Sequence, residues 1–220
     1  MFYWLIKGLA WPIVRLYLRF RRSDKERVPR KGPCIVIANH SSYLDAICLG
    51  SACPRKLHFL ISIDIYRMLG LRWLYFLMGT IPLRTDGADT RAMKTALDVL
   101  RRGGAIGVFP EGQRMRDGRL GEGKIGVAFL AARSGAPVVP AAIIGAYDAM
   151  PVGALLPRPR PVRVAFGDPL EYPEKGRVAG REDLLAFANH VMQAIADLGA
   201  PAPRSAGKDP GAPREKGERS

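Results

Sequence analysis

The chain has 220 residues, 48% of them hydrophobic, which is enough for one domain with a sizeable core. Its formal net charge of +14 at pH 7 suits nucleic acid or an anionic membrane, but the sequence has no zinc-finger spacing and no glycine-aromatic RNA-binding signature, so nucleic acid is disfavoured. Cys34, Cys48 and Cys53 lack C-x-x-C spacing and share no ligand spacing with the histidines, so we expect reduced, mostly buried thiols in a cytosol-facing protein and no metal site.

Residues 1–20 combine aromatic side chains with three cations, and residues 1–31 hold nine Lys or Arg against two acidic residues. A signal peptide is disfavoured because the charges are misplaced and no small-residue cleavage site follows. A membrane-spanning helix is disfavoured because cations interrupt the apolar run and Pro12 should kink it. We expect two short interfacial segments, whose apolar side chains enter the bilayer while the cations meet anionic lipid phosphates. The alternative is a helix that packs on the domain's own core.

Residues 34–38 are apolar and rich in β-branched side chains, and they predict a buried strand that delivers His40 to a sheet edge. Ser41 and Ser42 are typical N-cap residues, and the apolar residues beyond them indicate a helix. His40 and Asp45 would be about 500° apart within one helix, so they meet only across a strand-turn-helix junction. A carboxylate on one imidazole nitrogen raises the basicity of the other, which makes a general base. The alternative is a structural histidine in a turn.

Strands and helices are predicted to alternate along the rest of the chain. We expect strands at residues 57–61, 80–83, 105–109, 138–144 and 161–166, helices at 65–78, 89–102, 122–134 and 181–198, and irregular connections at 21–33, 116–119 and 147–161. This alternation predicts an α/β domain with a mixed, mostly parallel sheet flanked by helices. The expected organisation is a membrane-interface segment and basic connector (1–27), one domain (28–198) and a disordered tail (199–220).

A second group of polar residues follows the predicted strand at 105–109. Its Pro-Glu-Gly sequence must turn, which leaves Glu111 and Arg114 at the same kind of sheet edge as His40. Arginine suits phosphate because its planar guanidinium donates two parallel hydrogen bonds. Arg84 follows another short predicted strand, but a lone exposed arginine there carries no assignment by itself.

In combination these stretches resemble the glycerolipid acyltransferase family, typified by 1-acyl-glycerol-3-phosphate acyltransferase. Four of its motifs occur in the family's order between about residues 28 and 151. N-H-x-S-x-x-D is matched by Asn39, His40, Ser42 and Asp45, G-x-I-P-x-x-R is similar to residues 79–84, F-P-E-G-T-R-S is matched by Phe109, Pro110, Glu111, Gly112 and Arg114, and V-P-V is similar to residues 138–141. Any one motif is a weak signal, whereas four in one order are specific.

The resemblance implies acyl transfer from acyl-CoA or acyl-carrier protein to the free hydroxyl of a lysoglycerophospholipid, with 1-acyl-glycerol-3-phosphate giving phosphatidic acid. It implies that His40, oriented by Asp45, removes the hydroxyl proton, with no acyl-enzyme and no bound cofactor. The residues expected to hold the acceptor phosphate are Arg84, Glu111, Gly112 and Arg114, and Lys124 matches a further basic position of the family. The expected location is the cytoplasmic face of a bacterial inner membrane.

The sequence also departs from the family's pattern. Gln113 and Met115 stand where Thr and Ser are usual. Ser62 stands where many members carry a lysine that is thought to help stabilise the oxyanion. As oxyanion donors we expect instead backbone N–H groups near Gly112 or in residues 139–140.

Three other functions stay open on the sequence. The closest is transfer to another acceptor, such as lyso-ornithine lipid or glycerol 3-phosphate. A serine hydrolase or thioesterase would use Ser41 or Ser42 with His40, but the chain has no G-x-S-x-G elbow. A non-catalytic lipid-binding protein is the third, and the presence of both His40 and Asp45 argues against it.

Overall fold

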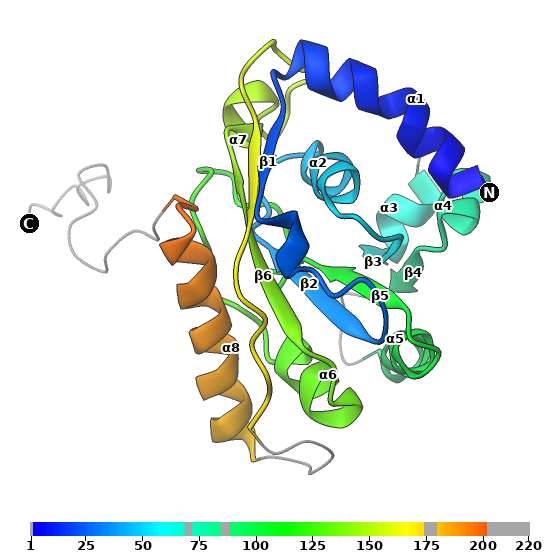
Figure 1. The fold of residues 1–220 in the computed structure, drawn as a ribbon, viewed down its shortest axis with the longest axis vertical. Helices are drawn as coiled ribbons and strands as arrows, with labels where there is room; N and C mark the ends of the chain where they lie inside the picture. Colours follow the sequence, from blue (N-terminus) through cyan, green and yellow to red (C-terminus); the bar gives the residue numbers. More distant parts are fainter. Residues whose placement is uncertain (1, 69–71, 85–88, 174–179, 202–220) are drawn as a thin grey trace, which may run out of the picture.

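Seven strands form one sheet in the order β1-β7-β6-β2-β5-β3-β4 (Figure 1). They are β1 (Arg21–Ser23), β2 (Cys34–Ala38), β3 (Leu57–Ser62), β4 (Ile81–Leu83), β5 (Ala105–Val108), β6 (Val138–Ile144) and β7 (Arg163–Phe166). All neighbouring strands are parallel except β6 and β7. This computed structural model describes residues 2–68, 72–84, 89–173 and 180–201. The predicted α/β fold with a mixed, mostly parallel sheet is confirmed.

Helices cover both faces of the sheet (Figure 1). They are α1 (Phe2–Tyr17), α2 (Asp45–Ala52), α3 (Ile63–Met68), α4 (Arg72–Met78), α5 (Thr90–Arg101), α6 (Gly126–Ser134), α7 (Ala146–Ala149) and α8 (Arg181–Asp197). α1 and α2 pack on one face, whereas α5, α6 and α8 pack on the other. The alternation along β2 builds both cores, because Ile35 and Ile37 face one layer while Val36 faces the other.

The connector expected at residues 21–33 contains a strand and a short helix. β1 is the edge strand beside β7, and it is followed by a 3-10 helix, η1 (Lys25–Arg27). β1 reads Arg-Arg-Ser, which has no apolar alternation and little strand propensity. Its pairing therefore depends on the open edge of β7, which sequence periodicity does not reveal.

α6 begins four residues later than expected, at Gly126. The amide of Gly121 donates to the Glu111 carboxylate, and the amide of Lys124 donates to the carbonyl of Pro110. These bonds hold the preceding segment against the turn after β5, so it does not form a helix. The opposite difference occurs at residues 147–161, where a loop was expected and the short helix α7 occupies the start.

Residues 2–17 form one helix, α1, with Pro12 inside it, so the expected pair of short segments is wrong. Tyr3, Val14 and Leu18 are buried against the domain, and this packing offsets the hydrogen bond that Pro12 cannot donate. Among the side chains of this region that the structure describes, Trp4, Leu5, Leu16 and Tyr17 are large, apolar and exposed. The helix therefore packs on the core, as the alternative expected, and keeps an apolar outer surface.

Two N-terminal cations bind the end of α2. Lys7 Nζ donates to the carbonyl of Cys53, and Arg22 Nη1 donates to the carbonyls of Ser51 (3.5 Å) and Ala52 (3.3 Å). The last carbonyls of a helix lack intrahelical partners and carry partial negative charge, so cations stabilise them. Lys7 and Arg22 therefore have partners within the protein, and the expectation that the N-terminal cations meet lipid phosphates stays a prediction.

The two ends of the chain were expected to be separate from the domain. α1 and β1 contact it directly, and the amide of Leu120 donates to the carbonyl of Pro201 at 2.8 Å. Residues 202–220, most of the expected disordered tail, lie outside the described residues. The boundaries before residue 28 and after residue 198 stay predictions. Within the described ranges, no helix is both long and apolar enough to cross a bilayer.

Candidate active site

The turn after β2 is fastened to the neighbouring strand β6 by Asn39. This buried side chain donates from Nδ2 to the carbonyl of Ile143 at 2.9 Å and accepts from the Ile143 amide at Oδ1 at 2.7 Å. Because both groups of the amide are used, the backbone that leads into His40 has one position relative to the sheet. His40 thus lies where β2 ends, at the carboxyl edge of the parallel strands, where α/β proteins place ligand sites.

His40 and Asp45 meet across the strand-turn-helix junction. His40 Nδ1 lies 2.9 Å from Asp45 Oδ2, and the same oxygen accepts the amides of Ser41 (2.6 Å) and Ser42 (2.7 Å). Asp45 is fully buried at the start of α2, where the helix dipole favours a negative charge. An ionised carboxylate only accepts, so Nδ1 carries the proton and Nε2 keeps its lone pair.

The imidazole of His40 is held on its flat side as well. It stacks on the Phe109 ring with centroids 4.1 Å apart, and Phe109 in turn stacks near Phe59 at 6.0 Å. The His40 side chain is 18% exposed, so a partner can still reach the ring. The geometry is that of a positioned base with one nitrogen available.

Ser42 is already engaged. Its Oγ donates to the carbonyl of Met150 at 2.7 Å and accepts from the amide of Leu44 at 3.1 Å. Ser42 therefore fixes the start of α2 to the segment after α7, and it is not poised to attack a substrate. This geometry argues against a hydrolase that uses Ser42 as its nucleophile.

Glu111 turns inward and binds backbone. Its Oε2 accepts from the His40 amide at 2.7 Å, and its Oε1 accepts from the Gly121 amide at 3.0 Å. The side chain is buried, and burial raises the pKa of Glu111 to about 7, while the two amide donors act to lower it. Glu111 therefore links the turn after β5 to the turn that holds His40.

We expect Glu111 to make stability depend on pH. Its raised pKa means that, between the ordinary value near 4.5 and about 7, the folded protein binds a proton that the unfolded chain has released. This group's contribution to the free energy of unfolding is therefore full below that window, falls as pH rises through it, and stays lost above it. The stability of wild type relative to Glu111→Gln should fall by roughly 3 kcal/mol across the window.

Urea unfolding of both proteins at the two ends of the window measures this difference. Glu122→Gln removes one exposed carboxylate from the same segment and controls for the change in net charge. A difference between wild type and Glu111→Gln that does not vary with pH would contradict the linkage.

The Lys124 side chain lies against Gly112 in the turn after β5. Gly112 has φ +71°, and a Cβ on it would lie 2.6 Å from Lys124 Nζ, so a side chain there would displace the ammonium group. The Gly112 amide donates to the carbonyl of Phe109 at 3.1 Å. That amide is therefore already bonded, which counts against the expectation that it meets the oxyanion. Lys124, which the sequence placed only by resemblance, is brought to this turn.

Arg114 lies beside the His40 turn. The amide of the next residue, Met115, donates to the carbonyl of His40 at 2.8 Å, and the Arg114 guanidinium lies 3.6 Å from the ring centre of Tyr43. Among the described residues, Arg114 Nη1 is buried without a hydrogen-bond partner, as is Asp45 Oδ1. A buried N–H with no partner is costly and is satisfied when an anion binds there.

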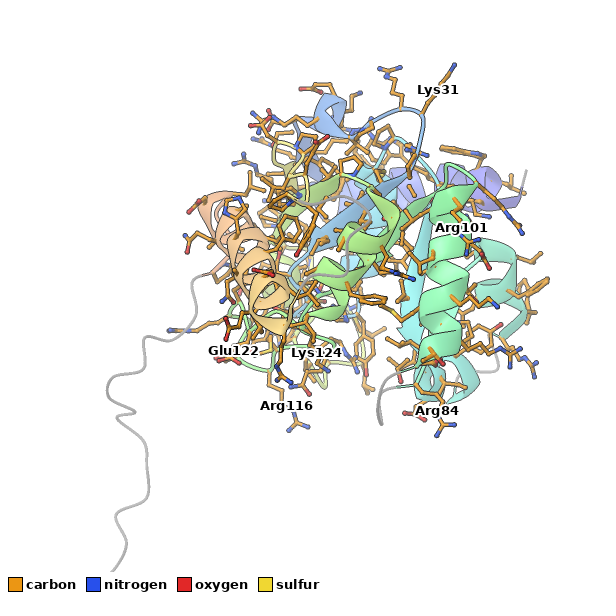
Figure 2. All side chains as sticks on the ribbon, turned by 90° about the horizontal axis from the view of Figure 1, so that it is seen from below. Lys31, Arg84, Arg101, Arg116, Glu122 and Lys124 are labelled. Carbon is orange, nitrogen blue, oxygen red and sulfur yellow. The ribbon has the colours of Figure 1, made fainter. Side chains whose placement is uncertain are left out.

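Other basic residues gather at the same edge. Figure 2 shows Arg84, Arg116 and Lys124 along one side of the molecule, together with the acidic Glu122, whereas Lys31 lies on the opposite side. Arg84 directly follows β4. Arg84 is exposed, and its amide donates to Asp89 at 2.8 Å. The carboxyl edge of the sheet is therefore rich in positive charge.

The motif before Arg84 depends on Gly79. This residue has φ +73°, and a Cβ on it would lie 2.8 Å from His58 Nδ1, which also contacts the Gly79 carbonyl at 2.7 Å. Only glycine fits this close approach.

Ser62 stands at the end of β3, where the family often has a lysine. Its hydroxyl donates to the Asp64 carboxylate at 3.4 Å.

The expected oxyanion donors in residues 139–140 are wrong. Val139 and Pro140 lie inside β6, buried and paired with Val36 and Ile37 of β2, away from the edge where His40 lies. Sequence reasoning also missed Tyr43 beneath Arg114 and Gly121 beside Glu111. No sequence signal marks them, because their role depends on partners distant along the chain.

The cysteines are buried free thiols, as predicted. Burial raises the pKa of Cys34 to about 11 and that of Cys48 to about 12, so both are neutral and unreactive near pH 7. In the part of the chain that the structure describes, no group of three or more His, Cys, Asp or Glu is placed to hold a metal ion.

Known proteins share this arrangement of sequence and fold. The Acyltransferase family profile matches residues 19–144. A chloroplastic 1-acyl-sn-glycerol-3-phosphate acyltransferase of Brassica napus is 30% identical over 149 residues, or 66% of this chain and 43% of that protein. The 1-acyl-sn-glycerol-3-phosphate acyltransferase of Bacillus subtilis strain 168 is 24% identical over 177 residues, or 80% of this chain and 85% of that one. The chain thus spans less than half of the plant relative.

A solved structure agrees on the fold. The crystal structure of the 1-acyl-sn-glycerophosphate (LPA) acyltransferase PlsC from Thermotoga maritima matches with a TM-score of 0.68 and 22% identity, over 90% of this chain and 83% of that chain. At this identity the likeness shows a common fold. The family profile covers more than half of the 220 residues and includes both polar turns at the carboxyl edge of the sheet. The chain belongs to the Acyltransferase family.

Proposed function

We propose that this acyltransferase moves a fatty acyl group from acyl-CoA or acyl-carrier protein to the free hydroxyl of 1-acyl-glycerol-3-phosphate and so makes phosphatidic acid. The observation that carries this proposal is the His40–Asp45 pair, with Nδ1 held at 2.9 Å and Nε2 left as the base. The printed names of the relatives in Brassica napus and Bacillus subtilis support this acceptor.

The reaction needs one base and no covalent intermediate on the protein. His40 Nε2 takes the proton of the acceptor hydroxyl as its oxygen attacks the thioester carbonyl carbon. The new C–O bond forms, the C–S bond then breaks, and the thiolate leaves as a thiol with the proton that His40 returns. Asp45 holds the ring and stabilises the imidazolium that forms during the transfer.

The acceptor phosphate is assigned to the basic edge beside His40. Arg114 is suited to it because Nη1 is buried without a partner among the described residues. Lys124 and Arg84 add positive charge at the same edge. Glu111 and Gly112 shape this site indirectly. The Glu111 carboxylate binds backbone amides, and Gly112 leaves room for the Lys124 side chain. A phosphate-bearing acceptor therefore fits better than lyso-ornithine lipid.

A panel assay tests the acceptor. Purified protein is given 1-acyl-glycerol-3-phosphate, glycerol 3-phosphate or lyso-ornithine lipid, each with acyl-CoA and with acyl-carrier protein. We expect the highest kcat/KM with 1-acyl-glycerol-3-phosphate. A higher value for either of the other acceptors would reject the acceptor while leaving the chemistry of His40 intact.

We further propose that the outer surface of α1 contacts the bilayer at the cytoplasmic face of the membrane. Figure 1 shows the N-terminal end of α1 beside α4, on the opposite side of the sheet from α8. Together these two helices expose Trp4, Leu5, Trp73, Phe76 and Leu77. An apolar surface of this kind, with aromatic residues, suits the boundary between lipid headgroups and acyl chains.

Replacing both Trp4 and Leu5 with Ser should lower binding to lipid vesicles by about tenfold or more, because two large apolar side chains no longer leave water. Turnover of a short-chain, soluble acceptor should persist, since neither residue contacts the site. Leu185→Ser, at an exposed leucine of α8, is the matched control. Co-sedimentation with vesicles measures the effect, and equal binding of wild type and the double variant would show that α1 is not the contact.

A further inference from the structure

The segment between α7 and β7 carries two of the most exposed leucines among the described residues. Leu155 is 93% exposed and Leu156 is 79% exposed, and these adjacent residues lie at a bend of this segment, called the tip below. In Figure 1 the yellow-green chain after α7 rises beside the C-terminal end of α1. That end adds exposed Leu16 and Tyr17, so four large apolar side chains come from two distant parts of the sequence.

The segment is held in place by hydrogen bonds. Tyr17 Oη donates to the carbonyl of Pro157 at 2.8 Å, and the amide of Val162 donates to the carbonyl of Leu18 at 2.9 Å. The amide of Arg158 donates to the carbonyl of Ala149 at 2.7 Å. Prolines in this segment restrict its backbone further. These bonds fix the backbone so that the two leucines remain exposed, although burial of apolar side chains would be more favourable in water.

Two arginines follow the leucines closely along the chain. Arg158 and Arg160 follow the leucines and line an open hollow of about 690 Å³, together with Tyr147 and Asp148. Arg15, in the last turn of α1, and Arg19, two residues beyond the helix, are exposed as well. The hollow is of a size that admits a small polar group such as a phosphate-bearing headgroup.

We propose that residues 152–160 and the last turn of α1 form a second lipid-docking surface, in which Leu155 and Leu156 enter the apolar layer of an anionic phospholipid bilayer and Arg158 and Arg160 bind lipid phosphates. A bilayer fits because protruding leucines beside arginines match an apolar layer beneath a layer of negative charge. A folded protein partner would need a complementary cavity for a convex tip.

This surface is joined to the candidate active site. Ser42 Oγ, in the His40 turn, donates to the carbonyl of Met150, which begins the segment. Tyr147 Oη donates to the carbonyl of Arg116, two residues after Arg114. Docking at this surface would therefore set how deep and at what angle His40 lies at the bilayer. The 16 residues of α1 span about 24 Å, from this second surface to the apolar surface beside α4.

The test uses the full chain and two double variants. One replaces Leu155 and Leu156 with Ser, and the other replaces Arg158 and Arg160 with Gln. Leu185→Ser and Arg181→Gln on α8 are the matched controls, since both residues are exposed on the other side of the sheet. Partitioning is measured on phosphatidylcholine vesicles with and without phosphatidylglycerol, across a salt series.

Each double variant should lower partitioning onto anionic vesicles by about tenfold or more. On pure phosphatidylcholine and at high salt, the arginine variant should partition like wild type, because the two arginines act through Coulomb attraction that salt screens. The leucine variant should partition more weakly than wild type under both conditions. Thermal unfolding and turnover of a short-chain, soluble acceptor should match wild type in all four variants.

Equal partitioning of wild type and both double variants would overturn the proposal. A raised KM for acyl-carrier protein with unchanged partitioning would overturn it too, and would assign the arginines to that acidic partner. Loss of self-association in the leucine variant, with unchanged partitioning, would assign the tip to a second copy of the chain. Partitioning tests this surface, whereas turnover of the soluble acceptor tests the proposed reaction, so the two can fail separately.

Discussion

His40→Ala is expected to lower kcat by about 10⁴-fold while the protein stays folded, because the base proposed to take the hydroxyl proton is removed. The buried partner Asp45 keeps two of its three contacts to Oδ2, from the amides of Ser41 and Ser42. Turnover of 1-acyl-glycerol-3-phosphate with acyl-CoA, together with a circular dichroism spectrum of the variant, measures this. Turnover near wild type would reject the mechanism.

Asp45→Asn should cost more than tenfold in kcat but far less than His40→Ala. The side-chain carbonyl of Asn can take the place of Oδ2 and accept the same three donors, with its NH₂ group at the position of Oδ1. The ring would then stay oriented, while the negative charge that stabilises the imidazolium is lost. A loss equal to that of His40→Ala would contradict this expectation, because it would show that the variant no longer orients the His40 ring or no longer folds.

Two serine variants separate this mechanism from a serine hydrolase. Ser41→Ala should leave turnover within a few-fold of wild type, because the Ser41 amide, rather than its hydroxyl, binds Asp45. Ser42→Ala should lower stability, since Ser42 Oγ bonds to Met150 and Leu44. A covalent acyl-serine detected by mass spectrometry in either position would contradict direct transfer.

Arg114→Ala should raise the KM for the acceptor by roughly 10- to 150-fold, with a much smaller change for the donor. This range corresponds to about 1.5–3 kcal/mol for a charge-assisted hydrogen bond to phosphate. The reason to expect the upper part of the range is that Arg114 Nη1 is buried without a partner among the described residues, so phosphate would satisfy it. Steady-state kinetics with each substrate varied in turn measures the two effects.

Two further variants sharpen the test of Arg114. Arg114→Lys keeps the charge but loses the planar fork and the contact with Tyr43, so its KM should lie between those of wild type and Arg114→Ala. Arg116→Ala removes a nearby exposed cation at the same edge and should change the KM less than about threefold. Equal increases for donor and acceptor would assign Arg114 to the phosphates of acyl-CoA instead.

Much of the fold could be predicted from local pattern. The runs at residues 34–38 and 138–144 are short, apolar and β-branched, and each became a buried strand. The pairing of His40 with Asp45 was also predictable, because both belong to one strand-turn-helix junction and only five residues separate them. Where the pattern was weak it failed, as with β1, whose three polar residues show no alternation.

Tertiary structure decided the features that join distant residues. Glu111 was expected to meet substrate, yet its carboxylate binds the amide of His40, 71 residues away. The sequence did not show which face of the N-terminal helix turns inward, whereas in the structure Tyr3 and Val14 are buried and Lys7 binds the carbonyl of Cys53 at the end of α2. Tyr17 reaches Pro157 across 140 residues and places two apolar segments side by side.

By itself, then, the sequence determined the local elements, the His40–Asp45 pair and the family, because periodicity, turn chemistry and short motifs depend on neighbours along the chain. The order of the strands in the sheet is a non-local property, since each strand pairs with segments far away in sequence. That order decided the partner of Glu111 and the inner face of α1, because both depend on burial against neighbours that are adjacent only after the sheet has formed. The position of the exposed Leu155 and Leu156 depends on hydrogen bonds between their segment and the end of α1, which are equally non-local.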